Sequence, residues 1–156
     1  MAEAKTNAMR QLDKAGIPYR LHTYSTEGGI DGVSVAAGLG QPVERVFKTL
    51  VTKGKSGHFV FVIPVAEELD LKAAARAAGE KAVEMLPVKE LLPVTGYVRG
   101  GCSPVGMKKR FPTFLDASAE GLEAIYVSGG RIGTQMELSP RALAGFIGAS
   151  FAPLTA

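Results

Sequence analysis

A glycine-rich stretch from Thr95 to Pro112 limits what this chain can fold into more than any other feature of the sequence. It reads TGYVRGGCSPVGMKKRFP, and its four glycines can adopt backbone angles that other residues avoid, while Pro104 fixes its own φ. The stretch therefore predicts a shaped loop. Consecutive N–H groups at Gly100, Gly101 and Cys102 can converge on one carbonyl or phosphate oxygen. An ordinary tight turn between strands is the alternative.

Short helical and strand-like segments make up the rest of the chain. The predicted helices span 6–15, 33–39, 70–78, 87–92 and 139–147, and the predicted strands span 19–24, 46–52, 58–65, 82–86, 114–117, 124–127 and 134–138. The strands come in runs and close pairs, which favours an α+β class with a curved, largely antiparallel or mixed sheet over regular βαβ winding. A length of 156 residues fits one domain, which we expect to span 1–156.

The composition excludes several kinds of site. Cys102 is the only cysteine, so an internal disulfide is impossible and a reducing compartment is favoured. With His22 and His58 as the only histidines, the ligand spacing of a zinc site is missing, and we expect neither a metal nor a cofactor. No apolar run has the length of a signal peptide or membrane span, so we expect a cytoplasmic protein. The net charge of +3 suits a polyanionic partner without proving one.

Lys48 is a charged residue inside the first strand of the β-hairpin predicted from residues 46–52 and 58–65. Period-two alternation puts it on one strand face with Val46 and Leu50, while Phe47 and Val51 occupy the other face. Neither face is plainly polar, and burying an unpaired charge costs several kcal/mol. Lys48 therefore pairs with an acid, extends its ammonium to the surface, or lines a polar cavity.

Three polar segments stand between the predicted elements. Residues 25–32 form a glycine-rich loop that can serve as a lid, and residues 128–133 form a second glycine loop, SGGRIG. The basic run Lys108-Lys109-Arg110 directly follows the first glycine loop, where it can meet a phosphate backbone or simply be a solvated surface.

Placed in order, these segments resemble the YbaK/EbsC family of aminoacyl-tRNA deacylases, free-standing relatives of the editing domain of bacterial prolyl-tRNA synthetase. The resemblance spans nearly the whole chain and is carried by residues 46–50, 69–72, 95–97, 100–104, 108–110 and 125–130. It implies a compact curved sheet or barrel flanked by helices. It also implies a pocket that receives the aminoacylated 3′-terminal adenosine of tRNA.

The resemblance implies roles for single residues. Lys48 corresponds to the family's essential lysine, expected to hold the terminal phosphate or adenosine and orient the ester, with Thr49 beside it. Gly100 corresponds to a motif glycine whose backbone contacts the aminoacyl carbonyl, and Gly101 continues that loop. Further residues that correspond to the substrate pocket are Tyr24, Ser128 and Gly129.

Two pocket positions depart from the family pattern. Relatives carry an apolar residue at the position of Cys102, so we interpret this cysteine as a small wall residue and not as a nucleophile. Close relatives carry an aspartate where this chain has Gln135, so a carboxylate contact to the substrate amine or ribose is missing. The loop at 25–32 is also shorter than in those relatives.

The implied activity is removal of cysteine from mischarged Cys-tRNA(Pro), with Cys-tRNA(Cys) as a further candidate substrate. The substrate's own thiol would attack its carbonyl while Lys48 and backbone amides position the ester, and the sequence suggests no Ser/His/Asp set to compete with that mechanism. The expected partners are the 3′ end of aminoacyl-tRNA and prolyl-tRNA synthetase. Two alternatives stay open: a deacylase of Ala-tRNA(Pro) or another small aminoacyl-tRNA, and a non-catalytic module that binds a nucleotide or RNA 3′ end.

Overall fold

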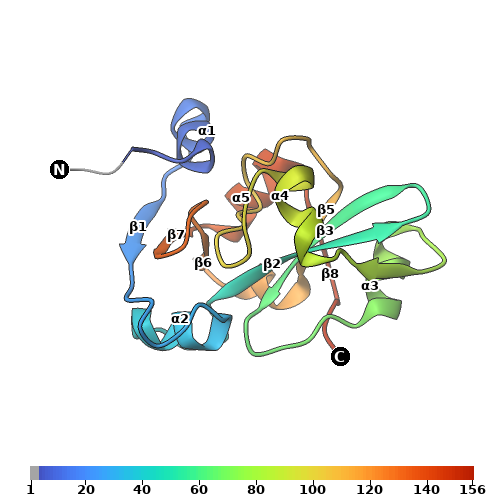
Figure 1. Ribbon diagram of the computed structural model, residues 1–156, viewed down its shortest axis with the longest axis horizontal. Coiled ribbons are helices and arrows are strands. Elements are labelled where there is room, and N and C mark those ends of the chain that lie inside the picture. Colours follow the sequence, from blue (N-terminus) through green and yellow to red (C-terminus); the bar gives the residue numbers. More distant parts are fainter. Residues whose placement is uncertain (1–3) are drawn as a thin grey trace.

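The computed structural model describes residues 4–156, and every helix and strand predicted from the sequence is present in it (Figure 1). In chain order the elements are α1 (Asn7–Ala15), β1 (Arg20–Thr23), α2 (Gly32–Leu39), β2 (Phe47–Gly54), β3 (Gly57–Pro64), α3 (Leu71–Ala78), β4 (Val83–Met85), α4 (Val88–Thr95), β5 (Thr113–Asp116), the 3₁₀ helix η1 (Ala117–Gly121), β6 (Ile125–Ser128), β7 (Thr134–Leu138), α5 (Pro140–Ile147) and β8 (Ser150–Ala152).

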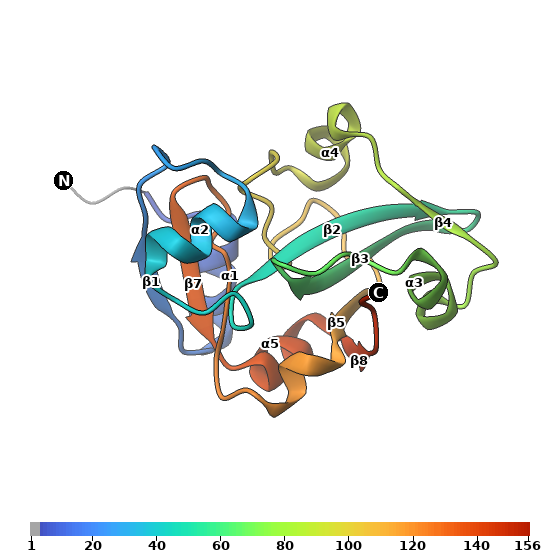
Figure 2. The same ribbon diagram turned by 90° about the horizontal axis from the view of Figure 1, so that it is seen from below.

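The strands of residues 4–156 form two sheets. The larger has the order β4-β2-β3-β5-β8, in which β4, β2 and β3 are antiparallel while β5 runs parallel to β3 and β8 parallel to β5. The smaller has the order β1-β7-β6 and is antiparallel throughout. A bridge between Val46 and Tyr126, next to the start of β2, joins them. Figure 2 shows the long β2–β3 hairpin running away from β1 and β7. The α+β class and the mixed sheet are confirmed, and the sheets do not close into a barrel.

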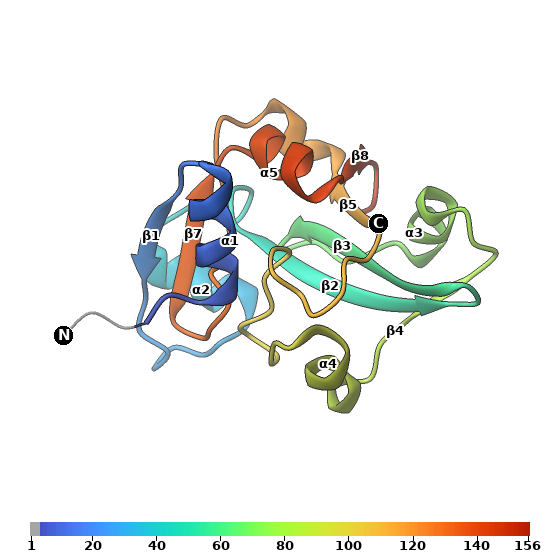
Figure 3. The ribbon, with the colours of Figure 1, turned by 90° about the horizontal axis from the view of Figure 1, so that it is seen from above.

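The main core lies where both sheets meet helices α1 and α5 (Figure 3). Leu12 of α1 and Leu143 of α5 are fully buried there, against Phe47 of β2 and Met136 of β7. Burying a side chain of this size stabilises the fold by about 1.5–3 kcal/mol. This cluster therefore fixes the start of β2 relative to β7, two strands that contribute walls to the cavity described below.

The glycine-rich stretch is a loop, as predicted, but its middle is not at the surface. Residues 101–105 are buried, and Ser103 has no exposed surface. The Tyr97 hydroxyl donates to the carbonyl oxygen of Val105 at 2.6 Å, and the Ser103 hydroxyl accepts the Val105 N–H at 3.2 Å. These bonds satisfy backbone groups that a buried loop would otherwise leave unpaired. The loop therefore packs as part of the core, with Cys102 in a cluster that includes Tyr97.

Two features of the fold differ from the sequence-based expectation. Strand β8 was not predicted; its three residues pair in parallel with β5, with Leu115 opposite Phe151. Helix α4 extends past Pro93 to Thr95, although a proline removes one helical hydrogen bond. The Thr95 hydroxyl donates to the Leu91 carbonyl oxygen at 2.7 Å, which helps to hold the last turn.

Candidate functional site

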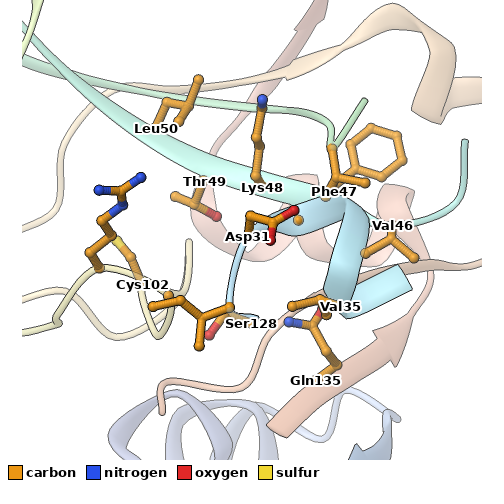
Figure 4. Close-up of a pocket in the computed structure, with 15 residues that line it drawn as sticks. Asp31, Val35, Val46, Phe47, Lys48, Thr49, Leu50, Cys102, Ser128 and Gln135 are labelled. Atoms are coloured by element: carbon orange, nitrogen blue, oxygen red, sulfur yellow. The ribbon is translucent and has the colours of Figure 1, made fainter. Parts of the chain in front are cut away.

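A cavity of about 310 Å³ opens where β2, the start of α2, the glycine-rich loop and strands β6 and β7 come together (Figure 4). Its walls contain Ile30, Asp31, Gly32, Val35, Val46, Phe47, Lys48, Thr49, Leu50, Val65, Arg99, Gly100, Cys102, Ser128 and Gln135. These residues span more than a hundred positions of sequence, so the cavity exists only because the fold brings both glycine loops to β2.

Lys48 lies in the cavity wall on β2, opposite Ile63 of β3. Its side chain is half-buried, and within residues 4–156 it forms neither a hydrogen bond nor an ion pair. Of the three roles left open by the sequence, pairing with an acid is therefore not observed, and Lys48 lines the cavity. In Figure 4 its ammonium lies at the opposite side of the view from Ser128 and Gln135.

Gly100 lines the cavity in a conformation that favours glycine, with φ +87°. A Cβ at this position would lie 3.1 Å from Cδ1 of Ile30 and 3.4 Å from Cγ1 of Ile132. The side chains of Ile30 and Ile132 therefore occupy the place where a side chain of residue 100 would lie. Because Gly100 has no side chain, its own backbone forms this part of the cavity wall.

The three consecutive N–H groups expected to converge on one oxygen do not all remain available. The N–H of Gly101 donates to the Val98 carbonyl oxygen at 3.0 Å, closing a turn. Gly101 itself packs against the backbone of Arg131 and Ile132 and does not line the cavity. Within residues 4–156 the N–H groups of Gly100 and Cys102 donate no hydrogen bond, so only these two of the three expected donors are left for a ligand.

Four other expected site residues line the cavity with Lys48 and Gly100: Thr49, Cys102, Ser128 and Gln135. Two do not. Tyr24 is buried behind the cavity, packed with Val35 and Val46, and Gly129 supports the second glycine loop, where its N–H donates to the Thr134 carbonyl oxygen at 2.9 Å. Both sit one layer outside the wall to which the sequence assigned them.

The Cys102 thiol is a poor nucleophile in this setting. The side chain is only 8% exposed, and burial raises the pKa of the thiol to about 12. The reactive form of cysteine is the thiolate, which is scarce at neutral pH for such a group. The environment agrees with the interpretation of Cys102 as a wall residue.

Three buried polar atoms at or behind the cavity have no hydrogen-bond partner: the Tyr24 hydroxyl, Thr49 Oγ1 and Gln135 Oε1. Buried polar atoms in proteins are nearly always paired, so unpaired ones gathered at one site indicate that a polar ligand belongs there. Thr49 and Gln135 line the cavity itself.

The sequence analysis missed two charged residues of the cavity wall, Asp31 and Arg99. Asp31 had a signal, because Asp directly before a short helix is a typical N-cap. The helix was placed one residue too late, at Val33, and the cap was overlooked. Arg99 stands between two glycines of the loop and gave no signal that distinguishes it from other surface arginines.

Three further charged or titratable residues, His22, Lys109 and Arg110, do not line this cavity. His22 Nε2 lies 2.9 Å from Glu137 Oε1. Lys109 and Arg110 border a separate cavity of about 190 Å³. Among the described residues no three side chains of His, Cys, Asp and Glu gather as metal ligands, and no helix has the length and apolarity to cross a membrane.

Comparisons with known proteins identify the family to which the chain belongs. The family model of the aminoacyl-tRNA editing domain matches residues 29–146. EbsC of Enterococcus faecalis, a proposed Cys-tRNA(Pro)/Cys-tRNA(Cys) deacylase, is 48% identical over 155 residues, which cover 98% of this chain and 94% of EbsC. The proline–tRNA ligase of Fervidobacterium nodosum is 28% identical over 61% of this chain and 16% of the ligase.

A solved structure shares the whole fold. A proposed trans-editing enzyme for prolyl-tRNA synthetase superposes with a TM-score of 0.86 at 25% identity, covering 99% of both chains. The family model includes β2, both glycine loops and the cavity between them. By sequence and by fold, the chain belongs to the aminoacyl-tRNA editing domain family.

Proposed function

We propose that this protein is an aminoacyl-tRNA deacylase that removes cysteine from mischarged Cys-tRNA(Pro), with Cys-tRNA(Cys) as a second substrate. Membership of the editing-domain family and the 48% identity to EbsC support an activity of this class. The observation that carries the proposal is the meeting of Lys48 and Gly100, far apart in sequence, in the wall of one cavity of about 310 Å³.

Different residues of the cavity can bind different parts of an aminoacyl ester. Lys48 and Arg99 supply positive charge for the terminal phosphate, and a phosphate accepts charge-assisted hydrogen bonds from both side-chain types. The N–H groups of Gly100 and Cys102 are donors for the ester carbonyl oxygen, on which negative charge develops during attack. Thr49 and Ser128 are then available to the ribose hydroxyls.

The reaction begins with the thiol of the substrate. Its sulfur attacks the carbonyl carbon of the same aminoacyl group, the ester bond to the ribose oxygen breaks, and the thiol proton ends on the released ribose hydroxyl. The product is a strained cyclic thioester, which water opens to free cysteine. Holding thiol and carbonyl in contact supplies much of the acceleration, because effective molarities of about 10⁵ M or more are typical of well-oriented intramolecular reactions.

No protein nucleophile is required by this scheme. The Cys102 thiol is held protonated by its burial, and neither His22 nor His58 lines the cavity. The protein's contribution is position and electrostatics. We also propose that prolyl-tRNA synthetase presents the tRNA, since the cavity recognises only its aminoacylated end.

A panel of charged tRNAs tests the function. Purified protein, with and without prolyl-tRNA synthetase, is mixed with Cys-tRNA(Pro), Ser-tRNA(Pro) and Ala-tRNA(Pro), and release of the amino acid is measured over time. We expect release of cysteine and almost none of serine, whose hydroxyl is a far weaker nucleophile. Faster release of alanine would contradict the thiol mechanism, and tight tRNA binding without any release would indicate a non-catalytic module.

A further inference from the structure

The proposed substrate carries a positive charge for which the residues assigned so far provide no anionic partner. The amino acid of an aminoacyl ester has an α-ammonium group, and drawing a cation into a cavity is costly unless an anion or hydrogen-bond acceptors replace its water. Lys48 and Arg99 are themselves cations, and Gln135 is neutral. If the proposed function holds, the cavity needs another partner for the ammonium group.

Asp31 is the one carboxylate among the described residues that line the cavity. It is the N-cap of α2, where Oδ2 accepts the Ser34 N–H at 3.2 Å and Oδ1 accepts the Ser34 hydroxyl at 2.7 Å. These two hydrogen bonds hold the pKa of the carboxyl below its usual range, so Asp31 is ionised at neutral pH. Each oxygen keeps a free lone pair for one further donor.

The charge of Asp31 is not neutralised by its neighbours. Within residues 4–156 it forms no ion pair, although Lys48 lines the same cavity. In Figure 4 the Asp31 carboxylate lies between Lys48 on one side and Ser128 on the other. The wall thus has separate positive and negative positions, which can orient a ligand that carries one charge of each sign.

Gln135 gives an independent indication of a ligand on this side. The residue is only 5% exposed and lines the cavity, and its Oε1 has no hydrogen-bond partner. Within residues 4–156 its Nε2 forms no hydrogen bond either, so a half turn about the last side-chain torsion can present the oxygen to the cavity. An unpaired buried amide is rare and is relieved by a ligand N–H.

We propose that Asp31, which lines the same cavity as the amide of Gln135, binds the α-ammonium group of the aminoacyl ester. Asp31 is a binding residue in this assignment, and it acts on the substrate directly. It replaces, from the start of α2, the carboxylate that the sequence lacks at position 135. The carboxylate at the cavity mouth selects esters with a free amine over N-acylated ones.

The test uses variants that keep the helix cap. Asparagine caps a helix about as well as aspartate, so Asp31→Asn removes the charge and little else. Asp70→Asn is the matched control, because Asp70 caps α3 by accepting the N–H groups of Lys72 and Ala73 and lies outside the cavity. Thermal unfolding of both variants checks that they fold; Asp31→Ser is a second cap-preserving variant.

Two readouts are compared. The first is kcat/KM on Cys-tRNA(Pro) and on the same tRNA carrying N-acetylcysteine. We expect Asp31→Asn to lose about fivefold on the free amine, a modest factor because Asp31 is exposed and water screens its charge. The loss should appear in KM, it should be absent with the N-acetyl substrate, and Asp70→Asn should match the wild type on both.

The second readout does not depend on turnover. Binding of cysteine methyl ester is compared with that of the methyl ester of 3-mercaptopropionic acid, which lacks the amine. The wild type should prefer the amine, and Asp31→Asn should not. If the wild type releases no amino acid but keeps this preference, the proposed function fails while this inference stands. If it does release cysteine and Asp31→Asn equals it in both readouts, the inference is wrong.

Discussion

Gly100 is the residue whose backbone shapes the cavity most directly. Its positive φ and the close approach of Ile30 and Ile132 leave no comfortable place for a side chain. Lys48 contributes in another way, because its side chain lines the same cavity from strand β2. In our account Lys48 contributes a cation, and Gly100 contributes a peptide group without a side chain.

A methyl group at Gly100 should therefore slow deacylation, an effect beyond its loss of stability. Gly100→Ala brings the cost of a left-handed alanine, about 1–2 kcal/mol, and also pushes Cβ toward Ile30. Gly40→Ala is the control, since Gly40 also has a positive φ of 68° but nothing lies within 4 Å of its Cβ position. Urea unfolding should show a loss of stability for both variants, larger for Gly100→Ala by the cost of the contact with Ile30. Only Gly100→Ala should slow deacylation, and equal activity of the two would contradict the placement of the ester at Gly100.

Cys102 should behave as a buried, protonated thiol. With its pKa raised to about 12, its thiolate content near pH 8 is on the order of a thousandfold below that of an exposed cysteine. The rate of alkylation by iodoacetamide should keep rising from pH 7 to pH 10 without a plateau, and urea-unfolded protein should react quickly. A plateau with a midpoint near pH 8.5, or loss of deacylation in Cys102→Ala, would contradict the wall role.

At the scale of the element, the sequence predicted most but not all of the fold. Helix α3 followed from Asp70 as cap and Gly79 as stop, because these signals are local. Strand β8 could not be predicted, since its three residues are too few to show a period and its partner β5 lies more than thirty residues away. Helix α4 continues past its proline to Thr95, whose hydroxyl donates to the Leu91 carbonyl oxygen in the last turn, a side-chain contact that propensity does not include.

Helix α2 should be sensitive to a single methyl group at its first residue. A Cβ on Gly32 would lie 2.5 Å from Cβ of Val65, so Gly32→Ala forces the start of the helix away from Val65, which directly follows β3, at a cost of about 1–3 kcal/mol. The double variant with Val65→Ala should recover part of this loss. Gly145→Ala in α5, where nothing lies within 4 Å, should instead stabilise the protein by about 0.5–1 kcal/mol.

Urea titrations followed by circular dichroism measure these changes. Because Gly32 and Val65 both line the cavity, Gly32→Ala should also raise KM for the charged tRNA. Wild-type stability in Gly32→Ala would show that α2 does not pack as closely on Val65 as the structure indicates.

At the scale of the whole molecule, a complete prediction of the site residues requires the three-dimensional arrangement of segments far apart in sequence. Lys48 was found because it breaks a strand pattern, and Gly100 because its loop is rich in glycine. Tyr24, Gly101 and Gly129 were expected in the pocket wall but do not line the cavity, since sequence alone cannot separate a wall residue from the residue behind it. Asp31 was missed because the helix was expected to begin at Val33, which hid its N-cap, and because only the fold brings the start of α2 to the cavity.

We propose that residues 1–156 unfold as one domain. The two sheets share a core built from α1, β2, β7 and α5, and the bridge at Val46 joins them. Urea unfolding followed by circular dichroism and by tyrosine fluorescence should give coincident transitions, as expected for a two-state domain. Separate midpoints for the two signals would contradict a single cooperative unit.

The central claim is that Lys48 and the uncovered backbone of Gly100 hold the charged end of a tRNA. Its most direct measurement is the initial rate of cysteine release from Cys-tRNA(Pro) by the wild type, Lys48→Ala and Lys53→Ala. Lys53 is an exposed lysine on the same strand and serves as the control. Our account predicts that Lys48→Ala loses at least about tenfold in rate, the value of one hydrogen bond to a charged group, while Lys53→Ala stays near the wild type. Full activity in Lys48→Ala would contradict it.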